Sequence, residues 1–532
     1  MAGRRLLCAI VVAAAGLHAV SISQSLLPAQ DGLKFIRIAR QFHHQPWADV
    51  VRQADQHPLY PALVALVHPL VAGWLGPGPD SWRVAAQGVA AAASLALLFP
   101  LFGLSRALFH TPIAQLAVLI FVLLPVPAEV GRDTLADSLG LLGVALSLGW
   151  GCRALRDDSW PAALAAGLAG GLGYLARPEA ILAPVAVGLA WMIRHVHAGR
   201  LRAAVAAPAL PALAFTTLAL VGGYALIKGE VSEKLALRQA AGLGAPAVQR
   251  RPAPQWLPPG LDDPRWDFSP KEETERKRIG GVTNALTRIA SQWWEELCWG
   301  FAVMAVWGMA RSRFIRRMCD LEEPQRARGP ERLVLATFVI LFGSALTRHA
   351  AIAGYLSGRH TLPLVLVSTP WAAAGCYVCM RRLGELLPWS RQTARAVGLL
   401  GIGLVASILA AYQLRPPHPS RWGHWAAGRW LAEHRGPAET VLDTRGWARF
   451  VSESPGYDFW HVRQAFTDSR LSYVVVGHDE LQADSPRART LNAVLAHAAS
   501  PLRDFPAFHD GMSVGVRIYR FHRPDHWQGI AP

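Results

Sequence analysis

Charged residues that could do chemistry stand in short polar stretches beside long apolar runs. The stretch "PAQDGLKFIRIAR" carries Asp31 directly after the first apolar run, and "EVGRDTLADSLGLLGVAL" carries Arg132, Asp133 and Asp137. Ionisable groups at membrane depth are costly, so they are functional candidates by default. The alternative for the second stretch is a simple charged loop.

Three further stretches carry candidates of the same kind. His57 stands in "QADQHPLYPALVAL", just before an apolar helix whose first turn can accept proline. Arg177 and Glu179 stand in "YLARPEAILAPV", which is otherwise an ordinary turn with a local ion pair. Arg359 and His360 stand in "RHAAIAGYLSGRHTLPLVLV", and a guanidinium there could hold a phosphate through two N–H groups.

Asp31 alone has a simple structural explanation. Apolar residues recur with helical spacing through 31–44, with cations on the other side, which predicts a basic helix lying on a membrane surface. Asp31 would precede its first turn, where aspartate is a good N-cap. The local pattern therefore leaves a helix cap and a reactive carboxylate both open.

The elements that must position these residues are membrane-spanning helices. The chain has 532 residues, 52% hydrophobic and 17% charged, with apolar runs long enough to cross a bilayer. The net charge of +16 comes largely from arginines between apolar runs, as the positive-inside rule produces, and does not indicate nucleic-acid binding. The predicted spans are 6–27, 83–104, 112–128, 135–152, 161–176, 179–194, 204–227, 293–310, 333–349, 361–380 and 396–414.

These eleven spans place the basic loops on one side of a bacterial-type inner membrane, with a cytoplasmic N-terminus. An odd count puts the C-terminal region outside, together with segments near 28–82 and 228–292. We expect a transmembrane domain over 1–414 and a small extracytoplasmic α/β domain over 415–532. There "RWLAEHR" is helical, "TVLD" and "LSYVVVGHDEL" contain buried strands, and "SVGVRIYRFHR" alternates like a half-buried strand.

The five stretches, in this order, resemble the GT-C superfamily of membrane glycosyltransferases. The resemblance is strongest to its family-39-like group, which includes protein O-mannosyltransferases, the lipid A aminoarabinose transferase and RgtA/B/C/D-like enzymes. "GRDTLADS" is similar to a Ser-Arg-x-x-x-x-Asp-Ser pattern, "HPLYP" to His-Pro-Pro-Leu, and "SGRHTLPL" to Arg-Tyr-x-x-Pro. The resemblance covers about 1–415. Two departures stand out: many members have Asp-Glu where this chain has Asp31-Gly32, and His360 replaces the usual tyrosine.

The resemblance implies a polytopic GT-C-like fold that transfers a sugar from a polyprenyl phosphate to an acceptor hydroxyl on the outer face of the membrane, with inversion. Asp31 would be the general base and Asp137 would orient the acceptor or the base. Cations around the leaving lipid phosphate would lower the barrier. The resemblance assigns the phosphate to Arg359, Arg132 and His360, and the shaping of the pocket to His57, Arg177 and Glu179.

No cofactor is indicated by the sequence. A divalent metal is conceivable, but the missing acid at Gly32 leaves it without support. The partners are the lipid-linked donor, membrane lipids and an acceptor that could be a lipid, a protein or a polysaccharide. A transporter or flippase would also need many spans and buried charge, although no repeated half is visible. A membrane-anchored sensor is a third interpretation.

Overall fold

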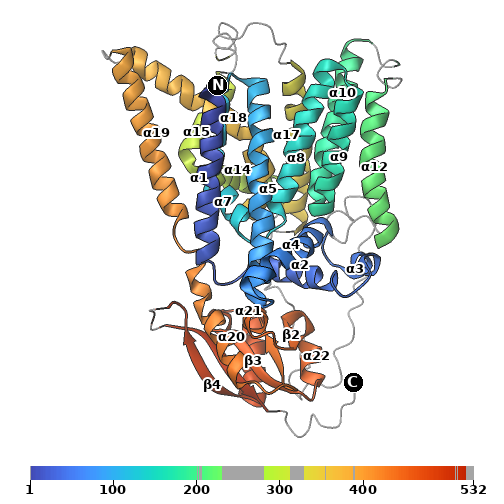
Figure 1. The fold of residues 1–532 in the computed structure, drawn as a ribbon, viewed down its shortest axis with the longest axis vertical. Helices are drawn as coiled ribbons and strands as arrows, with labels where there is room; N and C mark the ends of the chain where they lie inside the picture. The colour runs from blue at the N-terminus through green and yellow to red at the C-terminus, as the bar shows by residue number, and fades with distance from the viewer. Residues whose placement is uncertain are drawn as a thin grey trace.

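The computed structural model describes residues 2–199, 202, 207–229, 281–311, 315, 329–353, 355–386, 390–509, 511 and 513–522. They form three levels, namely a helical bundle, a layer of short helices at one of its ends, and a small sheet domain beyond that layer (Figure 1). The outer segment predicted near 228–292 falls outside the described residues except at its two ends.

The bundle and the layer are built from the following helices. They are α1 (Ala2–Gln24), α2 (Gln30–Gln41), α3 (Trp47–Gln53), α4 (Leu59–Leu75), α5 (Pro79–Leu108), α6 (Thr111–Leu123), α7 (Pro125–Arg132), α8 (Asp137–Asp157), α9 (Trp160–Ala176), η1 (Pro178–Ile181), α10 (Leu182–His197), α12 (Ala209–Lys228), α14 (Gly281–Glu296), α15 (Cys298–Ala310), α17 (Gly329–Ala353), α18 (Gly358–Leu386) and α19 (Arg391–Gln413).

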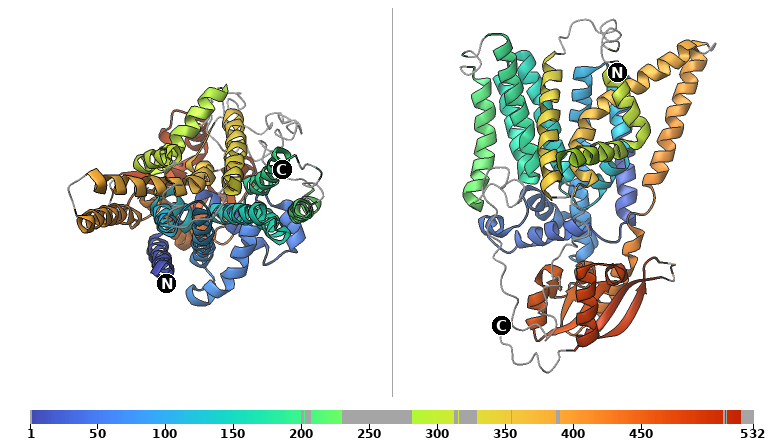
Figure 2. Two further views of the ribbon diagram at one scale, coloured as in Figure 1. Left: turned by 90° about the horizontal axis from the view of Figure 1, so that it is seen from above. Right: turned by 180° about the vertical axis from the view of Figure 1, so that it is seen from behind.

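Among the described residues, eight helices are long and apolar enough to cross a membrane, or nine if the bent pair α6 and α7 counts as one span. The chain is therefore an integral membrane protein, but eleven spans are not confirmed. The predicted span at 161–176 corresponds to the shorter helix α9. That at 293–310 is divided at Leu297 between α14 and the 13-residue α15. The N-terminus and the sheet domain lie at opposite ends of the bundle (Figure 2).

The span predicted at 112–128 is broken for a local reason. Leu124 precedes Pro125 and has an extended backbone, as residues before proline usually do. The chain bends by 65° at this point, and the short helix α7 continues to Arg132. The bend turns α7 toward the end of the bundle where the α2–α4 layer lies (Figure 1).

Helices α8 and α9 approach each other closely through small residues, as the glycines and alanines of the sequence indicate. A Cβ atom on Gly143 would lie 2.5 Å from the Cα atom of Gly173. Only glycine permits this contact, which fixes α9 against α8. The contact sets the position of Arg177, the residue directly after α9, relative to Asp137 at the start of α8.

Helix α2 is amphipathic as predicted, but its apolar face does not lie on lipid. Phe35, Ile36, Ile38 and Ala39 are buried, and the Phe35 ring meets the Tyr60 ring of α4 edge-on at 5.1 Å. The same periodicity suits a helix packed on protein and a helix packed on a membrane. The apolar face therefore packs against protein, chiefly α4 and α5. The prediction that this face lies on a membrane surface was wrong.

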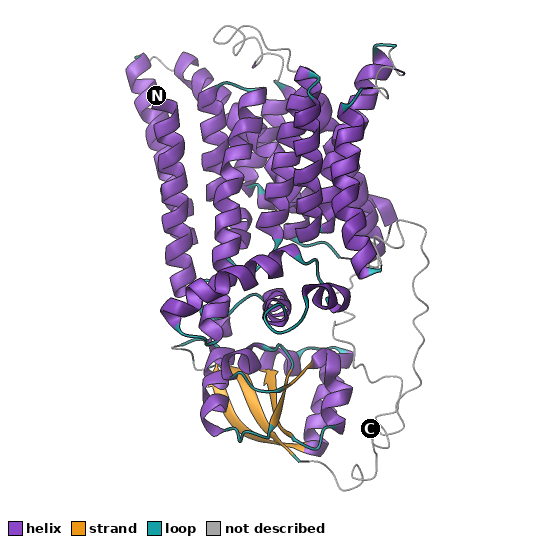
Figure 3. Ribbon diagram, turned by 45° about the vertical axis from the view of Figure 1, so that its right-hand side comes forward, coloured by secondary structure: helices purple, strands orange, loops and turns teal. Residues whose placement is uncertain are grey.

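The C-terminal region contains all the strands of the described residues (Figure 3). Its elements are η3 (Pro419–Arg421), α20 (Trp422–His434), β1 (Thr440–Asp443), α21 (Trp447–Ser452), β2 (Gly456–Asp458), η4 (Phe459–His461), α22 (Val462–Thr467), β3 (Leu471–Gly477), α23 (His478–Gln482), α24 (Pro486–Ala498), β4 (Ala499–Pro506) and β5 (Val514–Phe521). The sheet order is β2-β1-β3-β5-β4. The pairings of β1 with β2 and β3 are parallel, and β5 is antiparallel to both β3 and β4. The predicted helix and three strands are confirmed, while β2 and β4 were not predicted.

Candidate active site

Asp31 and Arg359 form an ion pair that joins α2 to α18. One Nη of Arg359 donates to a carboxylate oxygen of Asp31 at 2.9 Å, and both side chains are partly exposed. The two residues are 328 positions apart in the chain. The structure therefore brings together the carboxylate and the cation for which the resemblance implies separate roles.

Asp31 is not the N-cap of α2. The cap is Ala29, whose side chain cannot accept a hydrogen bond, and Asp31 is the second helical residue. Its carboxylate remains in the first turn, where the helix dipole favours negative charge. Burial raises the pKa of Asp31, but the nearby cations Arg359, Lys34 and Arg177 outweigh it and hold the pKa below its ordinary value. Asp31 is therefore ionised at neutral pH.

A second ion pair lies beside the first. Arg177 donates to Asp137 at 2.7 Å and lies 3.8 Å from Glu179, which confirms the local pair expected in "LARPEA". The Asp137 side chain is only 4% exposed, and the Arg177 guanidinium is a cation that compensates the burial of this carboxylate. The two ion pairs also attract each other electrostatically, because the Asp137 carboxylate acts on Arg359 and the Asp31 carboxylate acts on Arg177. The result is one cluster of alternating charge.

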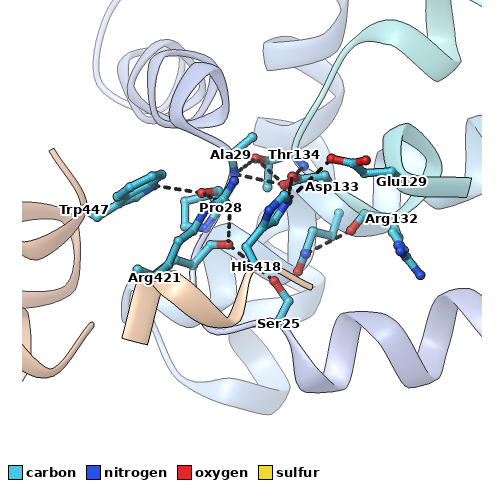
Figure 4. A network of polar contacts seen from close by, with 12 residues as sticks. Ser25, Pro28, Ala29, Glu129, Arg132, Asp133, Thr134, His418, Arg421 and Trp447 are labelled. Carbon is cyan, nitrogen blue, oxygen red and sulfur yellow. Dashed lines mark hydrogen bonds and ion pairs between the residues drawn. The ribbon is translucent and has the colours of Figure 1, made fainter. Parts of the chain in front are cut away.

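The segment that leads into α2 is held by the bundle. The backbone N–H of Ala29 donates to Asp133 Oδ1 at 2.9 Å and to Thr134 Oγ1 at 3.0 Å (Figure 4). Asp133 Oδ1 also accepts the Thr134 N–H at 2.7 Å. Asp133 ends α7 while Asp137 begins α8, so the two do not share a helical face as their spacing suggested. Asp133 instead fixes the start of the helix that bears Asp31.

The C-terminal domain holds the same segment from the other side. The Trp447 indole N–H and one Arg421 Nη both donate to the Pro28 carbonyl, at 2.9 and 3.0 Å (Figure 4). His418 lies 3.4 Å from Asp133 Oδ2. Burial raises the pKa of Asp133, but the His418 contact, the Arg421 charge and the Thr134 N–H lower it below its ordinary value. Nothing in the linear sequence connects 418–447 with 28, so this contribution was missed.

Gly32 has a steric explanation. A Cβ atom there would lie 1.7 Å from Thr134 Oγ1, 2.6 Å from Thr134 Cβ and 2.9 Å from the Thr134 carbonyl oxygen. The space that a second acid would occupy beside Asp31 is thus filled by Thr134. Because Thr134 also accepts the Ala29 N–H, the glycine and the threonine belong to one arrangement.

The other predicted residues lie in different contacts. Arg132 donates to the Gln413 carbonyl at the end of α19, at 2.6 Å, and no contact joins it to Asp31 or Asp137. The buried His57 stacks on the Tyr224 ring and meets the Tyr174 ring edge-on.

His360 contacts the Ser357 hydroxyl at 3.0 Å and packs against the Tyr355 and His349 rings. It therefore supports the start of α18, beside Arg359.

A polar cleft of about 830 Å³ runs from Asp31 to the C-terminal domain. One wall is the cationic side of α2, with Lys34, Arg37 and Arg40, and the other wall is formed by loops of the sheet domain. Arg40 crosses the cleft to Glu453 at 3.3 Å, and Arg37 lies 3.5 Å from Asp55, so these two cations pair with protein carboxylates. Among the described residues, no three His, Cys, Asp or Glu side chains are grouped to hold a metal ion.

Comparisons with known proteins bear on the fold that carries these residues. Residues 57–226 match the family described as dolichyl-phosphate-mannose-protein mannosyltransferase. The structure resembles ArnT from Cupriavidus metallidurans, with a TM-score of 0.53 and 12% identity over 98% of each chain. It also resembles the oligosaccharyltransferase AglB from Archaeoglobus fulgidus, solved with an inhibitory peptide and a dolichol-phosphate, with a TM-score of 0.53 and 13% identity over 93% of this chain and 72% of AglB.

The chain has the GT-C fold of membrane glycosyltransferases. This confirms, at the level of the superfamily, the resemblance carried by the five ordered stretches. The family match begins at His57 and includes Arg132, Asp137 and Arg177 but not Asp31 or Arg359. The comparisons do not favour the transporter interpretation. No curated protein matches the sequence.

Proposed function

We propose that the protein transfers a sugar from a polyprenyl-phosphate donor to an acceptor hydroxyl, with inversion at the anomeric carbon. The observation that carries the proposal is the pair of coupled ion pairs, Asp31–Arg359 and Asp137–Arg177, beside a polar cleft. Asp31 belongs to α2, in the layer of short helices at one end of the bundle (Figure 1), and we propose that a lipid-linked phosphate and a water-soluble acceptor meet there. The basic loops of the sequence support an extracytoplasmic position for the cluster.

Asp31 serves as the general base in this proposal. The acceptor hydroxyl gives its proton to the Asp31 carboxylate as its oxygen forms a bond to the anomeric carbon. The bond between that carbon and the phosphate oxygen breaks, and the lipid phosphate leaves with the electron pair. Attack from the face opposite the phosphate gives inversion. The lowered pKa keeps Asp31 ionised and ready to accept the proton at neutral pH.

Arg359 couples the base to the leaving group. A guanidinium has five N–H donors, and the contact with Asp31 uses one of them. The remaining donors can bind the phosphate and stabilise the charge that develops on it. A phosphate that draws Arg359 away from Asp31 would also free the carboxylate for the acceptor. Donor binding would then activate the base.

Arg177 and Asp137 support this centre from the bundle. The buried Asp137 keeps the Arg177 guanidinium in place, and the charge of Arg177 reaches Asp31. We assign Asp137 a positioning role through Arg177. Arg132 supports the bundle through its hydrogen bond to the end of α19, and His57 does so by stacking on Tyr224. His360 supports the start of α18 through its contact with Ser357.

The test uses the purified full chain in lipid nanodiscs with a panel of polyprenyl-phosphate sugars. Released polyprenyl phosphate is measured with and without cell-envelope extract, and with and without divalent metal. We expect release from at least one donor, and a loss of about 10²–10⁴-fold in the variant Asp31→Asn, the usual range for a general base. No release from any donor, or wild-type turnover in Asp31→Asn, contradicts the proposal.

A further inference from the structure

The crevice at the ends of the parallel strands in the C-terminal domain has the properties of a ligand site. Strand β1 lies between β2 and β3, and the chain passes from β1 to β2 on one side and then crosses to β3 on the other. The loops after β1 and β3 therefore diverge at a topological switch point. In open sheets of parallel strands, ligands bind in the crevice outside the carboxyl ends at such a point.

Charged side chains connect the two loops at this crevice. Arg445, two residues after β1, donates to Asp479 at 2.5 Å and lies 3.4 Å from Glu480, both of which follow β3. Glu480 also accepts the Thr444 hydroxyl at 2.5 Å and an Arg487 Nη at 2.7 Å. Glu480 is nearly buried, whereas the Asp479 side chain is 68% exposed. The loops are held rigidly, and Asp479 and Arg445 offer polar atoms to a ligand.

The crevice opens onto the cationic side of α2. Arg445, Asp479 and Glu480 line the same cleft of about 830 Å³ as Asp31. This volume lies within the range of about 300–1,000 Å³ that small-molecule sites occupy. A Cβ atom added to Gly446, in the loop after β1, would lie 3.2 Å from the Leu33 side chain of α2, so the two walls come close together two residues from Asp31. A molecule bound at the strand ends can therefore extend toward the carboxylate.

The chemistry of the walls indicates what that molecule is. Most lining side chains are charged or carry amides. Two of the apolar lining residues, Ile36 and Phe459, are 1% and 2% exposed, and the Arg487 guanidinium lies over the Phe459 ring at 4.1 Å. Because charged and amide side chains outnumber the apolar ones, the cleft favours a hydrophilic ligand over a lipid tail. A sugar hydroxyl both donates and accepts hydrogen bonds, and a carboxylate beside a guanidinium offers it both partners.

We propose that this cleft binds the acceptor and that the acceptor is a carbohydrate chain. Its hydrophilic portion rests on the Arg445–Asp479 pair at the β1–β3 switch point, and its reacting hydroxyl reaches Asp31. The acceptor assignment rests on the proposed function, whereas carbohydrate binding in the cleft does not. The C-terminal domain then selects the acceptor, while the bundle holds the lipid-linked donor.

Two variants address the crevice and one matched variant serves as the control. Asp479→Asn keeps the shape of an exposed side chain and removes its charge, and Arg445→Gln removes the partner. Arg470→Gln makes the same exchange at an exposed arginine that pairs with Asp468, just before the amino end of β3. Thermal unfolding of each purified full chain shows whether it is folded.

Binding is measured by saturation-transfer NMR with a panel of soluble neutral and acidic oligosaccharides and a panel of peptides. We expect wild type and Arg470→Gln to bind at least one oligosaccharide equally, and Asp479→Asn and Arg445→Gln to bind it at least tenfold more weakly. Peptide binding without oligosaccharide binding, no binding of any oligosaccharide, or wild-type affinity in both crevice variants overturns the proposal.

Release of polyprenyl phosphate by wild type is recorded on the same preparation. If oligosaccharides bind but no donor is consumed, the proposed transferase function fails while the cleft remains a carbohydrate site. If donor is consumed but no oligosaccharide binds, the transferase function stands and this inference falls.

Discussion

Substituting Gly32 by alanine tests how the base is held in place. The new Cβ atom would lie 1.7 Å from Thr134 Oγ1, where ordinary contacts begin at 3.4 Å. Rotation of the Thr134 side chain could relieve this contact, but not those with its Cβ atom at 2.6 Å and its carbonyl oxygen at 2.9 Å. Either α2 or the α7–α8 connection must therefore move by several tenths of an ångström.

The expected cost follows from these contacts. Overpacking of this kind costs about 1–3 kcal/mol. Alanine regains at most about 1 kcal/mol over glycine through helix propensity. Moving Thr134 also weakens its bond from the Ala29 N–H, worth about 1 kcal/mol, although Asp133 can still accept that N–H. The net loss in the free energy of unfolding is about 1–2 kcal/mol.

Turnover should respond more strongly than stability, because Asp31 is the neighbouring residue. A displacement of about 1 Å at a reacting group can cost about 10²-fold in rate. We therefore expect Gly32→Ala to lower donor turnover by about 10–100-fold. The assays are reversible denaturation in mixed micelles and release of polyprenyl phosphate from the preferred donor.

A double-mutant cycle separates the contact from other effects. In a Thr134→Ala background, Gly32→Ala should be less damaging by about 0.5 kcal/mol or more. Gly88→Ala in α5 is the matched control, because nothing lies within 4 Å of its added Cβ atom. The steric reasoning is refuted if Gly32→Ala behaves like Gly88→Ala, or if the effects of Gly32→Ala and Thr134→Ala simply add.

Three further predictions concern the ion pairs and the buried carboxylate. Arg359→Gln removes the cation nearest to Asp31, while burial still raises the pKa of this carboxylate. The acid limb of the profile of kcat/KM against pH should therefore move to higher pH. An unmoved acid limb would show that Arg359 does not control the pKa of the catalytic base. The pKa of Asp133 is lowered in the folded protein, so the stability that its carboxylate supplies is present above the ordinary carboxyl pKa and is lost as pH falls through the folded value. Asp133→Asn should therefore lower the free energy of unfolding by about 1–3 kcal/mol near neutral pH. Unfolding of this variant should also depend less on pH in the acid range. Arg177→Met leaves the buried Asp137 without its cation and should lower the free energy of unfolding by about 3–5 kcal/mol. The double variant that adds Asp137→Asn should recover part of this stability. Equal stability of the single and double variants would contradict the pairing.

Much of the bundle could be predicted because hydrophobic runs report burial in lipid directly. Among the candidate residues that the sequence indicates, Asp31, Asp137, Arg177 and Arg359 come together in the structure, while their roles stay predictions. Which charge pairs with which could not be predicted. The separation of 328 residues between Asp31 and Arg359 leaves no periodicity that connects them.

Two errors have the same physical origin. The amphipathic pattern of α2 fits lipid and protein equally well, and only the packing of Phe35 on Tyr60 distinguishes them. An aspartate near a helix start can cap the helix or stand in its first turn, and the actual start at Gln30 was set by Asp133 from elsewhere in the chain. Local preference was overruled in both cases by a tertiary contact.

The hydrogen bond from Trp447 to the Pro28 carbonyl has a consequence for the synthesis of the protein. Trp447 and Pro28 are 419 residues apart, so the carbonyl leaves the ribosome long before its indole partner. At about 5–20 residues per second, translation of the intervening chain takes roughly 20–80 s. Throughout that time the segment bearing Asp31 is already synthesised but lacks its contacts with the C-terminal domain. The segment that bears Asp31 thus gains its second support only when the C-terminal domain docks, so any activity that needs this segment to be fixed would begin only after that step.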